Sequence, residues 1–469
     1  MNRTTILGCI FMASVSTAFA GGTAKIHGKI INPLADSITF TYFTDRLAFD
    51  QHNNTVKIAS DGSFHIDIPV EENYTNITVQ NGDQGTELFV QPGDDLTMTF
   101  DGKDFDNTMH YTGKGSDAAN FTAKHILQLN MTGQFSAAIQ PLFMKEPGDF
   151  ITESKAVLQK ELDFLEANKA DVPESFAKYW KALLTNDLYY DYLIYPTIHE
   201  MYKTSGAQIK EIPAESYKVS MEVPVAFSDA SISAPTYRNV VSTVYFIRLN
   251  AAGITDGKIL KDSVAKLANK NMPLQTREFF FAETLFRRIK ESPLADVEHD
   301  FASFKKSYPK SMYLPTLDKA VSLKKKLSKG QPAIDFSFTT LDGKEMKLSD
   351  LKGKVVYIDF WASWCGPCKR ELPYAKKVEE HFKDKEVVFL NVSIDDDQEA
   401  WKKAIETYKI DGIHTCEPGG WKSRIAAMYG INSVPSYFLL DKEGKFVTET
   451  TPRPSDTDNL TSMIEAALK

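Results

Sequence analysis

The chain has 469 residues, of which 42% are hydrophobic and 25% are charged, and its formal net charge is −8 at pH 7. That length predicts about three domains of roughly 150 residues each. The acidic balance argues against a nucleic-acid-binding surface, and four cysteines are too few for a scaffold held together by disulfides.

Residues 1–20 have the pattern of a secretory signal peptide. Arg3 precedes an apolar stretch that starts at Ile6, and Ala18-Phe19-Ala20 provides a small-residue cleavage site. The apolar stretch is shorter than the ~20 residues that cross a bilayer. We therefore predict a periplasmic or otherwise exported protein that is soluble after cleavage. A retained N-terminal membrane anchor and a lipid on Cys9 are the alternatives.

Residues 21–114 are predicted to form an antiparallel β-sandwich. Short runs of alternating apolar and polar residues, from Lys25–Ile31 to Leu96–Phe100, are separated by turn sequences such as Asp61-Gly62 and Asn81-Gly82. Seven such strands at this spacing are typical of a sandwich. The histidines of this segment are scattered without ligand spacing, so they indicate no catalytic or metal site.

Residues 115–329 are predicted to form a helical domain. Apolar residues recur there at helical spacing, and Pro196 is one of several prolines interpreted as helix stops. A cluster of tyrosines around Tyr192 is interpreted as core packing, with a partner-binding surface as the alternative. The segment is also a candidate homodimer surface. The predicted helices are 152–169, 174–194, 256–269, 274–290, 296–307 and 315–328.

Residues 330–469 alternate between strands and helices, which predicts an α/β domain with helices on both faces of a central sheet. The predicted strands are Phe336–Thr340, Val355–Phe360, Val387–Ile394, Ser436–Asp441 and Phe446–Glu449. The predicted helices are Pro367–Phe382, 398–409, 421–429 and 456–468.

A Cys-x-x-Cys sequence, Cys365-Gly366-Pro367-Cys368, directly follows the apolar strand Val355–Phe360. A helix that starts at Cys365 bends the chain enough for the two thiols to form a disulfide. The free N–H groups and the dipole at the helix start favour the thiolate form of Cys365. A zinc site would need further ligands, and the sequence has no second Cys-x-x-Cys and no His-x-x-x-His. We therefore predict a redox site without metal or cofactor.

The sequence from Asp359 to Lys369, Asp-Phe-Trp-Ala-Ser-Trp-Cys-Gly-Pro-Cys-Lys, resembles thioredoxin, as do Pro373 in the following helix and the later Val434-Pro435. The entry segment with Asp342-Gly343-Lys344, and Val392-Ser393-Ile394-Asp395 before an extra helix, are similar to the exported reductases of the TlpA/ResA group within the AhpC/TSA-like set. The resemblance covers residues 331–469. The front two thirds resemble, more weakly, the leader segments of exported TlpA-like proteins.

The resemblance implies a thiol:disulfide oxidoreductase that acts on disulfide-containing client proteins. Cys365 attacks the client disulfide as a thiolate, and Cys368 then resolves the mixed disulfide. The cycle needs an outside electron donor, expected to be a membrane thiol protein. The Gly366-Pro367 pair resembles that of strongly reducing thioredoxins.

The resemblance also implies roles for residues around the two cysteines. Asp359 matches the buried acid of thioredoxin, which takes the proton from the second cysteine, and Glu371 matches an acid of the TlpA/ResA branch. We expect Asp359 to dominate. A cis peptide at Val434-Pro435 is expected to face the cysteines and to bind an extended substrate, and Trp364 to belong to the docking surface.

Three readings of the function stay open at this point. The first is a reductase of protein disulfides. The second is an oxidase or isomerase that uses the same cysteines, and the third is a binding or scaffold protein whose thioredoxin-like domain is accessory. Cys416 is interpreted as a buried, inert thiol, with a third redox partner as the alternative.

Overall fold

The computed structural model describes residues 21–469 except 49, 72, 130–137, 205–211 and 225, so the predicted signal peptide lies outside the described residues. The chain divides into two compact units between Phe280 and Phe281, within helix α9 (Leu274–Glu291). None of the helices in the described ranges is long and apolar enough to cross a membrane.

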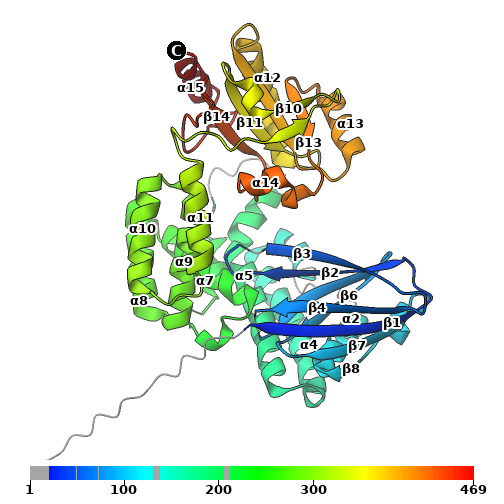
Figure 1. The fold of residues 1–469 in the computed structure, drawn as a ribbon. Helices are drawn as coiled ribbons and strands as arrows, with labels where there is room; N and C mark the ends of the chain where they lie inside the picture. The colour runs from blue at the N-terminus through cyan, green and yellow to red at the C-terminus, as the bar shows by residue number, and fades with distance from the viewer. Residues whose placement is uncertain (1–20, 49, 72, 130–137, 205–211, 225) are drawn as a thin grey trace, which may run out of the picture. The chain divides into compact units, whose positions relative to one another are not determined.

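The N-terminal region is β-rich, as predicted, and its strands form two four-stranded sheets (Figure 1). Alternate residues of most of these strands, such as Ile26 in β1 and Phe40 in β2, are buried in one hydrophobic cluster that both sheets share. The sheet orders are β4-β1-β7-β8 and β3-β2-β5-β6. The strands are β1 Gly22–Ile31, β2 Ser37–Thr44, β3 Asp50–Lys57, β4 Ser63–Val70, β5 Thr75–Asn81, β6 Gln84–Val90, β7 Asp95–Asp101 and β8 His110–Lys114.

One strand pair corrects the expectation of an antiparallel arrangement. Strands β1 and β7 run parallel, with Lys25 opposite Asp95 and Ile31 opposite Asp101. Short hairpins produce antiparallel neighbours, whereas strands joined by a long connection are free to run parallel. The connection from β1 to β7 contains the five strands β2 to β6.

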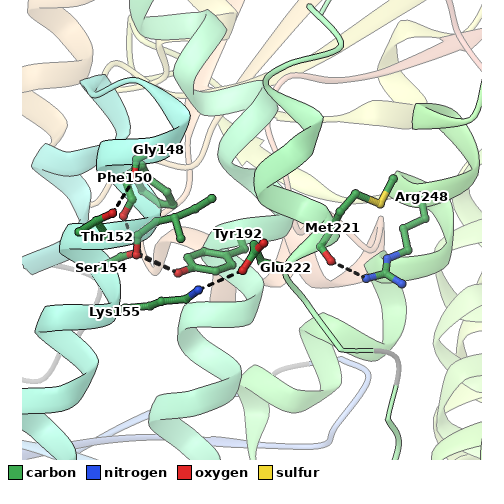
Figure 2. A network of polar contacts seen from close by, with 10 residues as sticks. Gly148, Phe150, Thr152, Ser154, Lys155, Tyr192, Met221, Glu222 and Arg248 are labelled. Carbon is green, nitrogen blue, oxygen red and sulfur yellow. Dashed lines mark hydrogen bonds and ion pairs between the residues drawn. The ribbon is translucent and has the colours of Figure 1, made fainter.

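The middle of the chain is helical, as predicted, and tyrosines contribute to its interior. Tyr192 and Tyr195 are fully buried in α5, and Tyr195 packs on Phe150 of α4 with a ring-centroid distance of 4.4 Å. The Ser154 hydroxyl lies 3.1 Å from that of Tyr192, and this hydrogen bond joins α4 to α5 (Figure 2). The interpretation of the tyrosine cluster as core packing is therefore confirmed for these two residues. The longer helices are α2 Ser116–Leu129, α4 Pro147–Asn168, α5 Glu174–Lys203, α7 Pro235–Ala251, α8 Gly257–Asn271 and α9.

The prediction that Pro196 stops a helix is wrong. Helix α5 continues through Pro196 as far as Lys203. Proline removes one backbone hydrogen bond and crowds the preceding turn, but tertiary packing of a buried helix face outweighs such local preferences. Pro196 and its neighbours Tyr192, Leu193 and Tyr195 are all buried, so the packing of this face favours the continuous helix.

The second unit begins within α9 at Phe281. It continues through helices α10 (Leu294–Ser307) and α11 (Leu314–Lys326) into the sheet β13-β12-β11-β14. Strands β11, β12 and β13 are parallel, and β14 is antiparallel to β11. This is a thioredoxin-like fold. Its elements are β9 Ser337–Thr339, β10 Glu345–Lys347, β11 Val355–Trp361, α12 Gly366–His381, β12 Val387–Ser393, α13 Gln398–Tyr408, β13 Ile413–Cys416, α14 Arg424–Met428, β14 Ser436–Leu440 and α15 Thr457–Leu468.

Strand β11 is central and is covered on both faces, which explains why its sequence is a continuous apolar run. Val356, Ile358 and Phe360 belong to a hydrophobic cluster with residues of α13 and α14. Val355 and Tyr357 belong to a separate cluster with residues of α12 and α15. The side chains therefore alternate between two cores, and Asp359 shares the parity of Tyr357.

Two local predictions for this unit need correction. The predicted strand Phe446–Glu449 is reduced to an isolated bridge between Phe446 and Leu440. Strand β13 was not predicted, because Ile413–Cys416 is only four residues long and carries a histidine and a threonine. Its pairing with β12 decides the structure of this short segment.

Candidate active site

Cys365 and Cys368 form a disulfide at the start of α12, just after the end of β11. Cys365 occupies the N-cap position of α12, and its Sγ accepts a hydrogen bond from the backbone N–H of Cys368 at 3.0 Å. Pro367 lies in the first helical turn, where a missing N–H costs nothing. The predicted geometry, with the first sulfur at a helix N-terminus, is confirmed.

The peptide bond between Val434 and Pro435 is cis, as predicted, and it lies beside the cysteines. The Val434 carbonyl oxygen is 3.6 Å from the Sγ of Cys365. Both cysteines are only 3% exposed. The disulfide is thus buried beside Val434 and directly follows the exposed Trp364 in the chain.

Asp395 holds the loop that carries the cysteines. Its carboxylate accepts hydrogen bonds from the backbone N–H of Ser363 at 2.8 Å and from the Ser363 hydroxyl at 2.7 Å. The hydroxyl of Ser393 donates to the same carboxylate at 2.7 Å. Asp395 is 1% exposed, so these charge-assisted bonds fix the loop just before Trp364.

Asp359 lies on the face of β11 that α12 covers. It lines a small cavity of about 10 Å³ together with Leu372 and Glu379 of α12, a space about large enough for one water molecule. Leu372 lies one helical turn after Cys368, so Cys368 and the cavity share a face of α12. The buried Oδ1 of Asp359 has no hydrogen-bond partner among the described residues.

The electrostatic environment of Asp359 favours its protonated form. Burial raises its pKa to about 8, with further contributions from the nearby Glu379 and Glu371 carboxylates. Burial also raises the pKa of Glu379 to about 7, and Asp411 adds to this effect. Glu379 was missed in the sequence because a helix glutamate eleven residues after Cys368 resembles an ordinary surface charge.

Glu371 is buried and tied to the segment before α15. Its carboxylate accepts hydrogen bonds from the backbone N–H of Ser455 at 2.8 Å and from the Ser455 hydroxyl at 3.1 Å. The sequence suggested either Glu371 or Asp359 as the proton acceptor. The structure gives them different environments, since Glu371 has partners on both oxygens and Asp359 has a buried oxygen without one.

An aromatic pair stands next to the disulfide. Trp364 and Trp421 are 56% and 42% exposed, and their ring centroids are 5.8 Å apart. Exposed tryptophans in contact are typical of docking surfaces. Trp421, in the short helix η5 (Gly420–Lys422), was not predicted, because sequence distance hides its proximity to Trp364.

Cys416 is a free thiol that is partly buried at the end of β13. Its Sγ lies 3.2 Å from the backbone oxygen of Asp395, and burial raises its pKa. A raised pKa lowers the thiolate fraction and hence the reactivity. This environment favours the interpretation of an inert cysteine.

The chain is similar to known thiol-disulfide oxidoreductases. The Redoxin family matches residues 328–468. A relative named thiol-disulfide oxidoreductase ResA from Bacillus anthracis is 35% identical over 126 residues, which are 27% of this chain and 71% of that protein. The ResA of Bacillus subtilis is 33% identical over 128 residues, which cover 27% of this chain and 70% of that protein.

Among solved structures, the thioredoxin domain of a thiol-disulfide oxidoreductase from Bacteroides vulgatus is 33% identical, with a TM-score of 0.28. The match covers 30% of this chain and 99% of that domain. These two relatives each match 27% of this chain, and the Redoxin match lies at its C-terminal end. Through that part, the chain belongs to the ResA family of thioredoxin-like thiol-disulfide oxidoreductases.

Proposed function

We propose that this chain is an exported reductase of protein disulfides, with Cys365 as the attacking sulfur. The observation that carries the proposal is the position of Cys365, at the N-cap of α12 and 3.6 Å from the carbonyl oxygen of Val434. The helix start favours a thiolate there. The backbone at Val434-Pro435 offers an edge to which an extended client segment pairs.

The chemistry proceeds in two exchange steps. The Cys365 thiolate attacks one sulfur of the client disulfide, which forms a mixed disulfide and releases the other client sulfur as a thiolate. The Cys368 thiolate then attacks the Cys365 sulfur and releases the second client sulfur. Two electrons pass to the client, and the Cys365–Cys368 disulfide is left for reduction by an external dithiol, which we assign to a membrane protein.

Asp359 is proposed to take the proton from the Cys368 thiol before the second step. Its cavity lies on the face of α12 that carries Cys368, and its raised pKa of about 8 lies close to that of a thiol. Matched pKa values make proton transfer efficient in both directions of the cycle. Glu371 is proposed to position the segment before α15 through its bonds to Ser455.

The organisation of the whole chain is also a proposal. We assign a signal peptide to 1–20, a β-sandwich domain to 21–114, a helical domain to 115–329 and a thioredoxin-like domain to 330–469. The core shared by the two sheets supports the sandwich domain, and the Redoxin match over residues 328–468 supports the last domain. Helices α10 and α11 belong to the second compact unit. A homodimer through the helical domain stays a prediction, which light scattering of the purified protein tests.

The reduction potential of the Cys365–Cys368 couple is the decisive measurement. The protein is equilibrated with defined dithiol and disulfide buffers, and free thiols are counted by mass. We expect a value near that of thioredoxin, about −270 mV. A value of about −120 to −180 mV would assign the chain to the oxidases and isomerases instead, and the absence of a reversible couple would leave the scaffold reading.

A further inference from the structure

The first compact unit contains a cavity that is separate from the redox site. Its volume is about 410 Å³, within the range of small-molecule sites. It lies where the sheet β3-β2-β5-β6 meets helices α2, α5 and the start of α7. Phe43 and Glu71, which are both exposed, mark its rim.

Aromatic side chains form one wall of this cavity. The ring centroids of Tyr74 and Tyr179 are 5.0 Å apart, and those of Phe89 and Trp180 are 5.5 Å apart. These side chains come from β6, from α5 and from the turn before β5, so several elements fix their positions. Faces of such rings attract organic cations.

The charged side chains of the cavity are mostly acidic. Four lining residues are carboxylates, namely Asp45, Glu71, Glu87 and Asp187, whereas Arg238 is the one lysine or arginine among the described lining residues. The Arg238 guanidinium already donates to the backbone oxygens of Ile232 and Ser233 at 3.0 and 3.1 Å. The cavity therefore favours a positively charged occupant over an anion.

Asp187 is the carboxylate with the fewest partners. It comes from α5, one helical turn after Leu183, which also lines the cavity. Among the described residues it has no hydrogen bond or ion pair, and burial raises its pKa to about 6. By contrast, His125 is paired with Glu161 at 2.5 Å. Asp187 is partly buried, and a carboxylate that is partly withdrawn from water without a partner is a costly arrangement that a cation relieves.

We propose that this cavity is a binding site for an organic ammonium cation, with Asp187 as the counter-ion and the Tyr74, Tyr179 and Trp180 rings as the apolar wall. Cation binding to aromatic faces is strongest where water is excluded. The lining residues all belong to the first compact unit, so the site shares no residue with the thiol site.

Isothermal titration of the purified protein with benzylammonium tests the proposal, with benzyl alcohol and benzoate as probes of the same shape and different charge. We expect saturable binding of the cation at one site, with an affinity on the order of tenfold above that of the alcohol. Equal affinity for the alcohol, tighter binding of benzoate, or no saturable binding of the cation at millimolar concentration would each overturn the proposal.

Two variants sharpen the test. Asp187→Asn keeps the shape of the side chain and is expected to lower the benzylammonium affinity on the order of tenfold. Asp163→Asn, an exposed position in α4 outside the cavity, is the matched control and is expected to bind like the parent protein. Unchanged binding by Asp187→Asn, with a melting curve like that of the parent, would refute the role of Asp187 as counter-ion.

A second titration separates two sources of the ammonium group. If Nα-acetyl-lysine methylamide, which keeps its side-chain ammonium, binds as tightly as benzylammonium, the site accepts a basic side chain. If benzylammonium binds more tightly, the natural ligand is a small amine with a ring. Both results support an ammonium site, and failure of both compounds to bind contradicts it.

Discussion

At the scale of single residues, two carboxylates of the thioredoxin-like unit lie in an environment that differs strongly from water. Asp359 carries a pKa of about 8 and Glu379 a pKa of about 7, in each case mainly because of burial. Buried acids with pKa values near neutrality are typical of proton-transfer sites. The proposed proton acceptor therefore makes distinct predictions about pH.

The first prediction concerns the pH dependence of client reduction. In the proposed mechanism the second exchange step needs the carboxylate form of Asp359, so its rate is expected to rise with pH up to about 8. Asp359→Asn should remove this rise and slow the step on the order of 100-fold at neutral pH. The rate of this step is measured as the decay of the mixed disulfide in a stopped-flow experiment at each pH. A larger loss in Glu371→Gln than in Asp359→Asn would reverse the assignment.

The second prediction concerns stability. An aspartate in the unfolded chain has a pKa of about 3.9, below the value of about 8 in the folded protein. Between these values the folded state binds more protons, so the free energy of unfolding falls as pH rises, by up to about 1.4 kcal/mol per pH unit. Asp359→Asn should therefore be more stable than the parent at pH 7 and equally stable near pH 3.5. Urea denaturation at both pH values checks this difference, and equal stability at pH 7 would contradict the buried acid.

The third prediction isolates Glu379. Its carboxylate raises the pKa of Asp359, so Glu379→Gln should move the inflection of the rate profile to lower pH. Glu380→Gln changes the adjacent, exposed glutamate and should leave the inflection in place. An unchanged profile in Glu379→Gln would show that the two carboxylates do not interact.

At the scale of elements, the redox site is assembled from the ends of β11, α12 and η5 and from the cis peptide before β14. The strand β11, the helix that begins at the cysteines and the cis peptide at Val434-Pro435 were all predictable, because each has a local signature in the sequence. The contribution of η5 was not predictable, since nothing local to Trp421 indicates that it lies next to Trp364.

The fourth prediction tests the contact between Trp421 and Trp364. Trp421→Ala should raise the KM for a protein client on the order of fivefold to tenfold, because aromatic side chains contribute strongly to docking. It should leave the reduction potential of the cysteines unchanged. Ile259→Ala removes another exposed apolar side chain, in α8 of the first unit, and should leave KM unchanged. A change of potential in Trp421→Ala would indicate a structural role instead.

At the scale of the whole molecule, the chain joins a thioredoxin-like unit to a larger unit with its own core and its own cavity. The proposed ammonium site and the thiol site share no residue. The two proposals thus assign a separate role to each unit.

The fifth prediction follows from this separation. Cys365→Ser should abolish disulfide reduction and leave the benzylammonium affinity as in the parent protein. Asp187→Asn should weaken benzylammonium binding and leave the reduction potential unchanged. Disulfide reduction and benzylammonium affinity are measured on both variants. A change of both properties in either variant would demonstrate coupling between the sites.

The sequence by itself determined the chemistry, because the Cys-x-x-Cys after an apolar strand, the Val434-Pro435 bond and Asp359 are carried by local patterns. It also determined the succession of a β-rich, a helical and an α/β region, because hydrophobic periodicity is local as well. Only the tertiary structure decided the parallel pairing of β1 with β7, the passage of α5 through Pro196, and the meeting of Glu379 with Asp359. These depend on packing between segments far apart in the chain, whose free energy outweighs local preference.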